Sequence, residues 1–411
     1  MIFHRKLSPL SALALVFFLG CAAPPPGPVA VPAAATPFGD DLDAESLRTA
    51  LRRSLQYLEK LPPDRIVGAA PRRFSAGEIA ASLKAFEPLL ADWNCAECFA
   101  RELRARFDFL PSSADAENAE VLFTGYYQPV LDGSRARSGK FLYPIYARPA
   151  DLITAEVVTL GAAAKTERVF GRVEGEQFLP YYTRSEIDRE GRLRGRALEI
   201  AWVADPVELF FLHIQGSGII RLAEGGELSV GFAAQNGRPY RSIGRLLIDA
   251  GKIASEAMSM QSLRRYLNAH PEERDEIFAY NPSYVFFRVS PGGEALGSLE
   301  VPVTAGRSIA ADARLFPRGA LALIQTEVPL IDGAGALAGW RPITRFVLIQ
   351  DTGGAIRGLQ RADIYFGAGR QAEAMAGYLN RRGRMFFLAL KQHGADQGAA
   401  PNAARFIPAR P

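Results

Sequence analysis

The strongest constraint on the fold of this chain is a buried-strand pattern that runs into a carboxylate and a pair of glycines. Residues 346–349 are FVLI, and Asp351, Gly353 and Gly354 follow closely. Four large apolar residues in succession are typical of a strand that is covered on both faces. The glycines allow backbone torsions or close approaches that a side chain would forbid. A second carboxylate, Asp363, follows beside residues that favour another strand, so two acids joined by a glycine-rich turn can face one cleft.

Two other interpretations of this pattern are open. Asp351 can cap the turn by accepting hydrogen bonds from backbone N–H groups, which is a common use of aspartate in turns. The apolar residues followed by Asp-Thr-Gly also resemble the signature of aspartic proteases, which need two carboxylates that share a proton. The chain contains no second Asp-Thr-Gly or Asp-Ser-Gly, so only an obligate dimer would supply a partner for Asp351.

Length and composition are those of a globular protein with a sizeable core. The 411 residues suggest two or three domains, at roughly 150 residues each, and a hydrophobic share of 48% is ordinary for such a protein. The formal net charge of +4 includes Arg5 and Lys6 of the N-terminal leader. The remaining excess is too small to indicate a nucleic-acid-binding protein.

Residues 1–20 have the pattern of an export signal. A short basic start precedes the apolar stretch 13–19, which is too short to span a bilayer and runs up to Cys21. This resembles a bacterial lipoprotein signal, in which the cysteine becomes the lipidated first residue; an ordinary secretory signal is the alternative. By the same resemblance, Ala22 favours the periplasmic face of the outer membrane. The Pro- and Ala-rich residues 21–39 indicate a tether between the lipid and the folded domain.

Two further cysteines, Cys95 and Cys98, lie within a helical pattern. An oxidising compartment permits a disulfide between them. A zinc site would need two more ligands, and the remaining histidines are scattered. The thioredoxin-like interpretation lacks the surrounding βαβ pattern. We therefore expect a structural or incidental pair and no metal site, and the sequence leaves open whether the disulfide forms.

Helical periodicity dominates the start of the mature chain, and strand patterns dominate the rest. Apolar spacing predicts helices over residues 43–61, 75–90 and 97–107, and Ser75 with Glu78 forms a capping box for the second. Short apolar and aromatic segments bounded by Gly and Pro predict strands at 121–129, 141–146, 198–203, 210–215, 284–287, 301–307, 320–326, 343–350 and 385–390. Helices interrupt this series at 242–250, at 261–278 and before residue 380. The class is mainly β with peripheral helices.

Four motifs resemble those of a known family. They are FTGYYQP at 123–129, QGSG at 215–218, NPSYVFF at 281–287, and RSIAAD at 307–312 followed by Asp351 and Asp363. In this order, behind a lipoprotein-like leader, they resemble the membrane-bound lytic murein transglycosylase A family over nearly all of the mature sequence. The last motif set is similar to the so-called three-aspartate domain of that family.

This resemblance implies an architecture. It predicts a double-psi β-barrel domain with helices, built from residues 40–129 and 289–395, and an inserted β domain at 130–288. A substrate groove would separate the two, and glycan strands of peptidoglycan would lie in it. Residues 396–411 are Ala- and Pro-rich and are expected to form a loose tail. No cofactor and no metal would take part.

The resemblance also implies roles for individual residues. Asp363 matches the acid/base of the family, and Asp351 and Asp312 match its other two aspartates. The groups expected to contact the glycan are Thr124, Tyr126, Gln215, Ser217, Gly353 and Gly354. Barrel packing is an equally good interpretation of Tyr126 and of the neighbouring tyrosines.

The chemistry of these residues fits the cleavage of a glycosidic bond. Such a reaction needs an acid at the leaving oxygen, and the pKa of that acid must be raised by burial or by a neighbouring carboxylate such as Asp351. A lytic mechanism needs one carboxyl only: Asp363 would next accept the proton of the sugar's own C6 hydroxyl, leaving a 1,6-anhydro end. The alternative is an expansin-like protein that binds peptidoglycan without cleaving it.

The expected partners follow from the same reasoning. They are peptidoglycan glycan strands, a membrane reached through the lipid on Cys21, and proteins of cell-wall synthesis or division. Nucleic acid is not among them, because the net charge of the mature chain is small.

Overall fold

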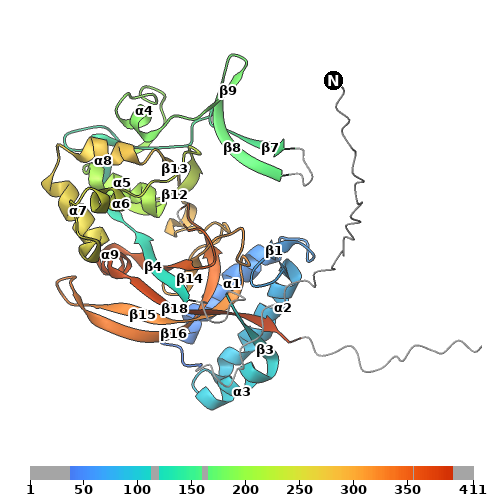
Figure 1. The fold of residues 1–411 in the computed structure, drawn as a ribbon. Coiled ribbons are helices and arrows are strands. Elements are labelled where there is room, and N and C mark those ends of the chain that lie inside the picture. Colours follow the sequence, from blue (N-terminus) through green and yellow to red (C-terminus); the bar gives the residue numbers. More distant parts are fainter. Residues whose placement is uncertain (1–37, 113–119, 160–164, 355, 392–411) are drawn as a thin grey trace, which may run out of the picture.

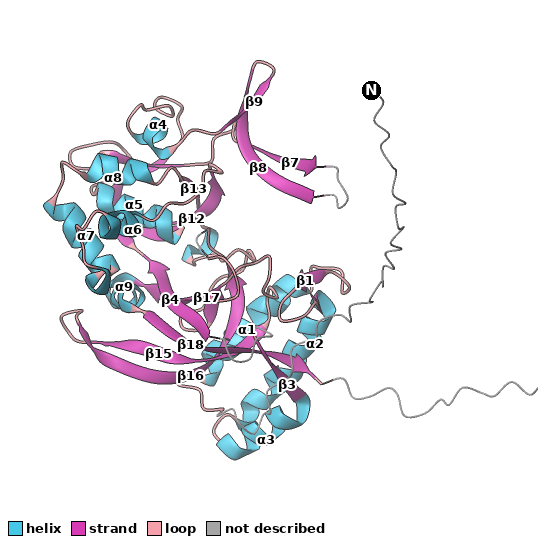
Figure 2. Ribbon diagram, viewed as in Figure 1, coloured by secondary structure: helices cyan, strands magenta, loops and turns pink. Residues whose placement is uncertain are grey.

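The computed structural model describes residues 38–112, 120–159, 165–354 and 356–391, which form two β-rich bodies joined by strand β4 (Figure 1). Helices lie around both bodies, as Figure 2 shows. Cys21, most of the expected tether and the predicted loose tail at 396–411 lie outside the described residues. None of the described helices is long and apolar enough to cross a membrane.

The lower body in Figure 1 contains a closed six-stranded barrel. Its strands run in the order β15, β16, β14, β17, β4 and β18, the pairing of β18 with β15 closes the ring, and β3 extends the sheet beside β18. The pairs β14–β16 and β17–β4 are parallel, and the other four pairs of the ring are antiparallel, in agreement with the predicted double-psi class. The bounds are β3 Phe107–Pro111, β4 Glu120–Gln128, β14 Ser308–Ala310, β15 Leu321–Ile331, β16 Leu337–Asp351, β17 Arg361–Ala368 and β18 Asn380–Leu390.

The origin of β4 sets the topology of the barrel. This strand precedes the second body in the chain, whereas the other five strands of the ring follow it. The barrel is therefore assembled from both ends of the described chain. The domain limits at 40–129, 130–288 and 289–395 stay a prediction.

Helices from the start of the chain cover one side of the barrel (Figure 2). Helix α1 (Ala44–Leu58) buries the apolar face that its spacing predicts. The hydroxyl of Ser75 caps helix α2 (Ala76–Phe86) by accepting from the N–H of Glu78, as predicted. The Glu78 side chain pairs with Arg72 instead of completing the capping box. Helix α3 (Ala96–Arg106) begins at the Cys95–Cys98 disulfide, which is formed.

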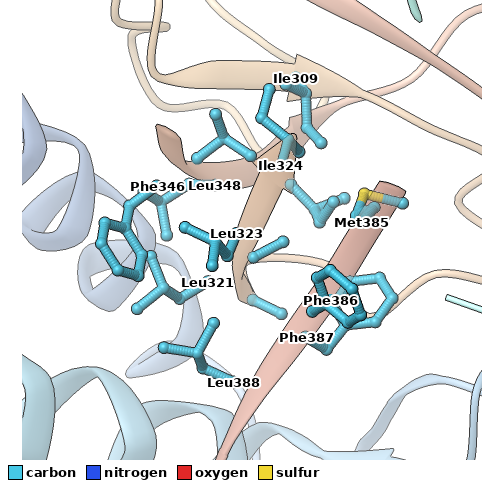
Figure 3. Close-up of a cluster of buried hydrophobic side chains, with 14 of the residues drawn as sticks. Ile309, Leu321, Leu323, Ile324, Phe346, Leu348, Met385, Phe386, Phe387 and Leu388 are labelled. Atoms are coloured by element: carbon cyan, nitrogen blue, oxygen red, sulfur yellow. The ribbon is translucent and has the colours of Figure 1, made fainter. Parts of the chain in front are cut away.

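The predicted buried strand at 346–349 lies in the middle of the main core. Figure 3 shows Phe346 and Leu348 of β16 among apolar side chains of β14, β15 and β18. The ring of Phe346 also lies 5.2 Å from that of Phe86 on α2 and 5.8 Å from that of Phe99 on α3. Truncating such a side chain to alanine typically costs about 3–5 kcal/mol, so the helices and the barrel depend on one another for stability.

The upper body contains a six-stranded sheet in the order β13, β12, β11, β5, β10 and β6, and a separate three-stranded sheet of β7, β8 and β9 that projects from it (Figure 1). The strand bounds are β5 Val130–Ser134, β6 Tyr143–Tyr146, β7 Ile153–Thr159, β8 Lys165–Glu174, β9 Gln177–Pro180, β10 Glu199–Val203, β11 Ser217–Leu222, β12 Glu227–Gln235 and β13 Val285–Val289. Its helices are α4 Arg184–Asp188, α5 Pro206–Gln215, α6 Ile243–Asp249, α7 Met260–Ala269 and α8 Arg274–Tyr280.

Three sequence-based predictions of secondary structure are wrong. Residues 210–215 are not a strand but the end of α5, which Asp205 caps and Pro206 opens; a short apolar run fits a buried helix equally well. The strand expected at 301–307 does not form, and the three-residue strand β14, Ser308–Ala310, follows directly after these residues. The helix expected at 261–278 is two helices, α7 and α8, separated at Pro271.

The two bodies are joined by a partly buried ion pair as well as by the chain. Arg264 of α7 pairs with Glu208 of α5 and with Glu373 of α9 (Gly369–Tyr378), the helix that packs on the barrel. The same guanidinium donates to the hydroxyl of Tyr127 on β4. Charges so well paired and partly buried are costly to separate, and they favour a fixed orientation of the two bodies.

Candidate active site

The outer face of the barrel carries a row of five aligned residues. Strand register places Asp363 of β17 beside Thr124 of β4 on one side and Ala310 of β14 on the other. Asn380 of β18 lies beyond Thr124, and Asp351 at the end of β16 lies beyond Ala310. Aligned residues project to the same face of a sheet. The positions before and after Asp363 are buried in the core, so this row faces outward.

Asp363 is held by two polar side chains. The Thr124 hydroxyl donates to Oδ1 of Asp363. The Arg361 guanidinium donates from Nε to Oδ1 at 3.1 Å and from Nη2 to Oδ2 at 3.4 Å, and Nη2 also reaches the Thr124 hydroxyl at 3.3 Å. Arg361 and Asp363 share a face because they lie two positions apart on one strand. The Asp363 side chain is 14% exposed and that of Arg361 is 35% exposed.

Burial raises the pKa of Asp363 above its ordinary value, while the charge of Arg361 and the hydrogen bond from Thr124 lower it. Burial prevails because a carboxylate loses much of its hydration in this position. The direction agrees with the sequence-based expectation, and burial is the cause. A carboxyl that holds its proton closer to neutral pH has the property that a general acid needs.

Asp351 is bonded to the backbone of its own turn and of a second loop. Its Oδ1 accepts from the N–H of Thr352 at 2.8 Å and from the N–H of Ser298 at 2.9 Å. Burial raises the pKa of Asp351 to about 6, and the charge of Asp363 adds to this rise. The sequence predicts that Asp351 raises the pKa of Asp363. In the structure the effect acts on the other residue: the charge of Asp363 raises the pKa of Asp351.

Asp312 lies behind the glycine-rich turn and outside the row. Its buried carboxylate pairs with Arg314 at 2.6 Å and accepts from the N–H of Gly358 at 2.9 Å. The hydrogen bonds from Arg314 and Gly358 hold the pKa of Asp312 well below its usual range. A carboxylate that stays ionised at neutral pH cannot deliver a proton. Asp312 is therefore bonded to the loop that connects Asp351 to Asp363 and helps to fix its position.

Tyr126 lies two positions after Thr124, on the same face of β4, and is half-buried. Its ring centroid lies 5.1 Å from that of Tyr365, and both rings contact a small apolar cluster with Ala295 and Val303. Burial, followed by the charge of Asp351, raises the pKa of Tyr126 well above its usual value. The ring of Tyr126 thus packs against that of Tyr365, and its contact with the glycan stays a prediction.

Gln215 and Ser217 lie where the upper body meets β4. The Oε1 atom of Gln215 accepts from the N–H of Tyr127 at 3.1 Å, and Ser217 is only 9% exposed. Gly216 between them has a φ of 77°, which ends α5 in the left-handed conformation. A Cβ on Gly218 would lie 2.5 Å from an α5 side chain. The motif therefore joins the upper body to the barrel strand that carries Thr124.

Gly353 and Gly354 differ in their surroundings. A Cβ on Gly353 would lie 3.1 Å from the side chain of Ile356, so its small size serves local packing. Gly354 is exposed and has no heavy atom within 4 Å of a Cβ position. Of the two, Gly354 has the open approach that a ligand would require.

Sequence reasoning missed three residues at this site. Arg361 could have been found from its spacing, because a residue two positions before Asp363 on a strand shares its face. Asn380 is exposed at the end of the row. Tyr240 belongs to the upper body. Burial raises the pKa of Tyr240, and the charge of Arg361 opposes that rise. Only the tertiary structure brings Tyr240 near Arg361.

The row has no grouping of metal ligands. In the described part of the chain, the side chains whose ligand atoms could meet at one ion are His270, Glu272 and Glu273. They lie at the surface of the upper body, between α7 and α8. The chemistry available at the row is that of carboxyl, hydroxyl, amide and guanidinium groups.

The fold and the site together define a class of protein: a two-body β protein whose barrel carries, on its outer face, a buried carboxyl group suited to acid catalysis. The MltA specific insert domain matches residues 122–288 and the 3D domain matches residues 307–389. A crystal structure of a membrane-bound lytic murein transglycosylase from Agrobacterium tumefaciens superposes with a TM-score of 0.71 at 30% identity, over 85% of this chain and 93% of that one. The chain belongs to the membrane-bound lytic murein transglycosylase A family.

Curated relatives agree with this assignment. Membrane-bound lytic murein transglycosylase A of Escherichia coli (strain K12) is 34% identical over 270 residues, and the similarity spans 65% of the length of each protein. The Vibrio cholerae relative is 30% identical over 277 residues, which is 67% of each. A crystal structure of E. coli MltA with bound chitohexaose has a TM-score of 0.64 and 28% identity, covering 84% of this chain and 90% of that one.

Proposed function

We propose that this protein is a lytic transglycosylase that cleaves the MurNAc-β-1,4-GlcNAc bond of murein, with Asp363 as its only acid/base. The observation that carries the proposal is the burial of Asp363 in the aligned row, which raises its pKa. Family membership supplies the substrate class, and the E. coli relative with bound chitohexaose supports a site for β-1,4-linked sugars.

The reaction needs two proton transfers at one carboxyl. Protonated Asp363 gives its proton to the glycosidic oxygen, and the bond from that oxygen to C1 of the muramyl residue breaks. The carboxylate that remains then accepts the proton of the C6 hydroxyl of the same sugar. The C6 oxygen forms a bond to C1, which closes a 1,6-anhydro ring and returns Asp363 to its protonated form. General acid–base catalysis of this kind contributes roughly a hundred- to ten-thousand-fold in rate.

The neighbours of Asp363 have separate supporting functions in this scheme. Thr124 orients the carboxyl through its hydroxyl. Asp351 is bound by two backbone N–H groups and organises the turn, and Asp312 fixes that turn from behind. Gly354 and Asn380 are the exposed members of the surroundings and are the groups that a glycan can reach. Gln215 and Ser217 act through the position of β4.

Product analysis tests the reaction. Purified protein is incubated with murein sacculi in oxygen-18 water, and the fragments are identified by mass before and after borohydride treatment. A lytic transglycosylase leaves unlabelled 1,6-anhydro-muramyl ends that borohydride does not reduce. Labelled, reducible ends would instead indicate hydrolysis and a second catalytic carboxylate, for which Asp351 is the candidate. Binding to sacculi without release of fragments would leave the expansin-like alternative.

We also propose that the protein is anchored to the outer membrane by lipid on Cys21 and faces the periplasm. The relatives are named membrane-bound, and the sequence before residue 38 has the lipoprotein pattern. The start of the described chain supports a fixed attachment point. Asp40 forms a fully buried ion pair with Arg307, and Asp41 pairs with Arg345. The residues that directly follow the expected tether are thus bound firmly to the barrel. We propose proteins of cell-wall synthesis or division as further partners at this membrane.

A further inference from the structure

Arg361 is at odds with the simplest requirement of the proposed reaction. A general acid must hold a proton, yet a guanidinium that donates to both carboxyl oxygens favours the ionised carboxylate. Arg361 donates in this way to Asp363, at 3.1 and 3.4 Å. A neutral amide could support the carboxyl without this cost. We therefore expect the charge of Arg361 to have a function other than support of Asp363.

The geometry of Arg361 leaves part of its guanidinium available. Nε and Nη2 are bonded within the row, whereas Nη1 makes no hydrogen bond to the residues that the structure describes. The side chain is 35% exposed, in contrast to the 14% of Asp363. Tyr240 of the upper body lies near enough for the charge of Arg361 to affect its pKa. Arg361 thus lies at the junction of the two bodies, where the proposed substrate would pass.

From this geometry, and resting on the proposed function, we infer that Arg361 recognises a free carboxylate of the glycan and in doing so releases Asp363 for catalysis. The carboxylate in question is the lactyl group of a muramyl residue that carries no peptide stem. A planar guanidinium binds a carboxylate through two parallel N–H donors, so the substrate can replace Asp363 as its partner. When a stem is attached, the lactyl carboxyl is an uncharged amide and this exchange does not occur.

The charges around Asp363 determine the direction of the effect. Arg361 on β17 is the positive group that faces it. The titratable groups in the surroundings are Asp351 at the end of β16, Tyr126 on the adjacent strand β4 and, beyond Arg361, Tyr240 of the upper body. Thr124 and Asn380 are neutral. Arg361 lowers the pKa of Asp363. Neutralising the guanidinium with a substrate carboxylate, or removing it by mutation, therefore raises this pKa and extends the protonated form of the acid to higher pH.

The test uses one set of glycan strands in two forms. Strands freed of peptide stems by an amidase carry free lactyl carboxylates, and coupling to ammonia converts these to neutral amides without changing length. Wild-type protein, Arg361→Gln and the control Arg101→Gln are compared by kcat/KM and by pH profile. Arg101 lies on α3, far from the row in the fold, with a side chain 71% exposed. Circular dichroism and thermal melting establish that each variant is folded.

Wild type and Arg101→Gln are expected to cleave the carboxylate form about tenfold faster than the amide form, the effect of one charge-assisted hydrogen-bonded pair. Arg361→Gln should lose this preference, and the high-pH limb of its profile should move to higher pH. If Arg361 has a structural role only, Arg361→Gln should lower the rates on both forms equally and keep their ratio. That result would overturn the inference. Equal wild-type rates on the two forms would also overturn it. If wild type cleaves neither form, the proposed function fails first, and this inference with it.

Discussion

Replacing Asp351 by asparagine should stabilise the protein at neutral pH, although it removes a residue of the proposed site. Burial raises the pKa of Asp351 from 3.8 to about 6. Each pKa unit corresponds to about 1.4 kcal/mol, so the ionised carboxylate costs the folded state up to about 3 kcal/mol. The amide oxygen of the substituted side chain can still accept from the N–H groups of Thr352 and Ser298. These bonds are weaker without the charge, and we therefore expect a net gain of about 1–2 kcal/mol.

The sign of this effect follows from linkage. Because the pKa of Asp351 is raised in the folded state, the unfolded state loses its proton first as the pH rises. The destabilisation is absent below about pH 4, grows between about pH 4 and pH 6, and is complete above that interval. The gain from Asp351→Asn should therefore be present at pH 7.5 and nearly absent at pH 4.

Urea unfolding followed by circular dichroism at the two pH values measures this difference. Asp332→Asn is a matched control, because Asp332 also accepts from two backbone N–H groups, those of Ala334 and Ala336, but in an exposed turn. It should show no comparable gain at pH 7.5. If Asp351→Asn is no more stable than wild type at pH 7.5, or if the gain is the same at both pH values, burial of the ionised carboxylate is not the dominant effect.

Three further outcomes are expected. Asp363→Asn should stay folded and lose roughly a hundred- to ten-thousand-fold in turnover of sacculi; near-normal turnover would assign the acid elsewhere. Thr124→Val removes the hydroxyl that lowers the pKa of Asp363. The high-pH limb of the kcat profile should therefore move to higher pH, and turnover should fall about tenfold. An unchanged pH profile would contradict this. Cys21→Ser should abolish labelling with fatty acid and release the protein from membranes, and persistent labelling would refute the anchor.

Much of the local structure was predictable because it depends on local chemistry. Apolar spacing identified the face of α1 that packs on the barrel, and Ser75 marked the start of α2. The apolar run at 346–349 is a core strand, as four successive large residues require. Where periodicity is too short to decide, it failed: residues 210–215 form a helix because Asp205 and Gly216 cap its ends.

The site itself shows where sequence reasoning stops. Asp351, Gly354 and Asp363 could be named because the turn that joins them is local. Their alignment with Thr124 depends on strand register between segments more than two hundred residues apart, and no local pattern encodes such a register.

The sequence by itself determined which chemical groups are present for the proposed functions: the carboxyl of Asp363, the hydroxyl of Thr124 and the thiol of Cys21. Tertiary structure alone decided what state those groups are in. Burial in the folded structure raises the pKa of Asp363, and the charge of Arg361 opposes that rise. Such effects depend on hydration and on distances between charges, and both are set only when the barrel closes.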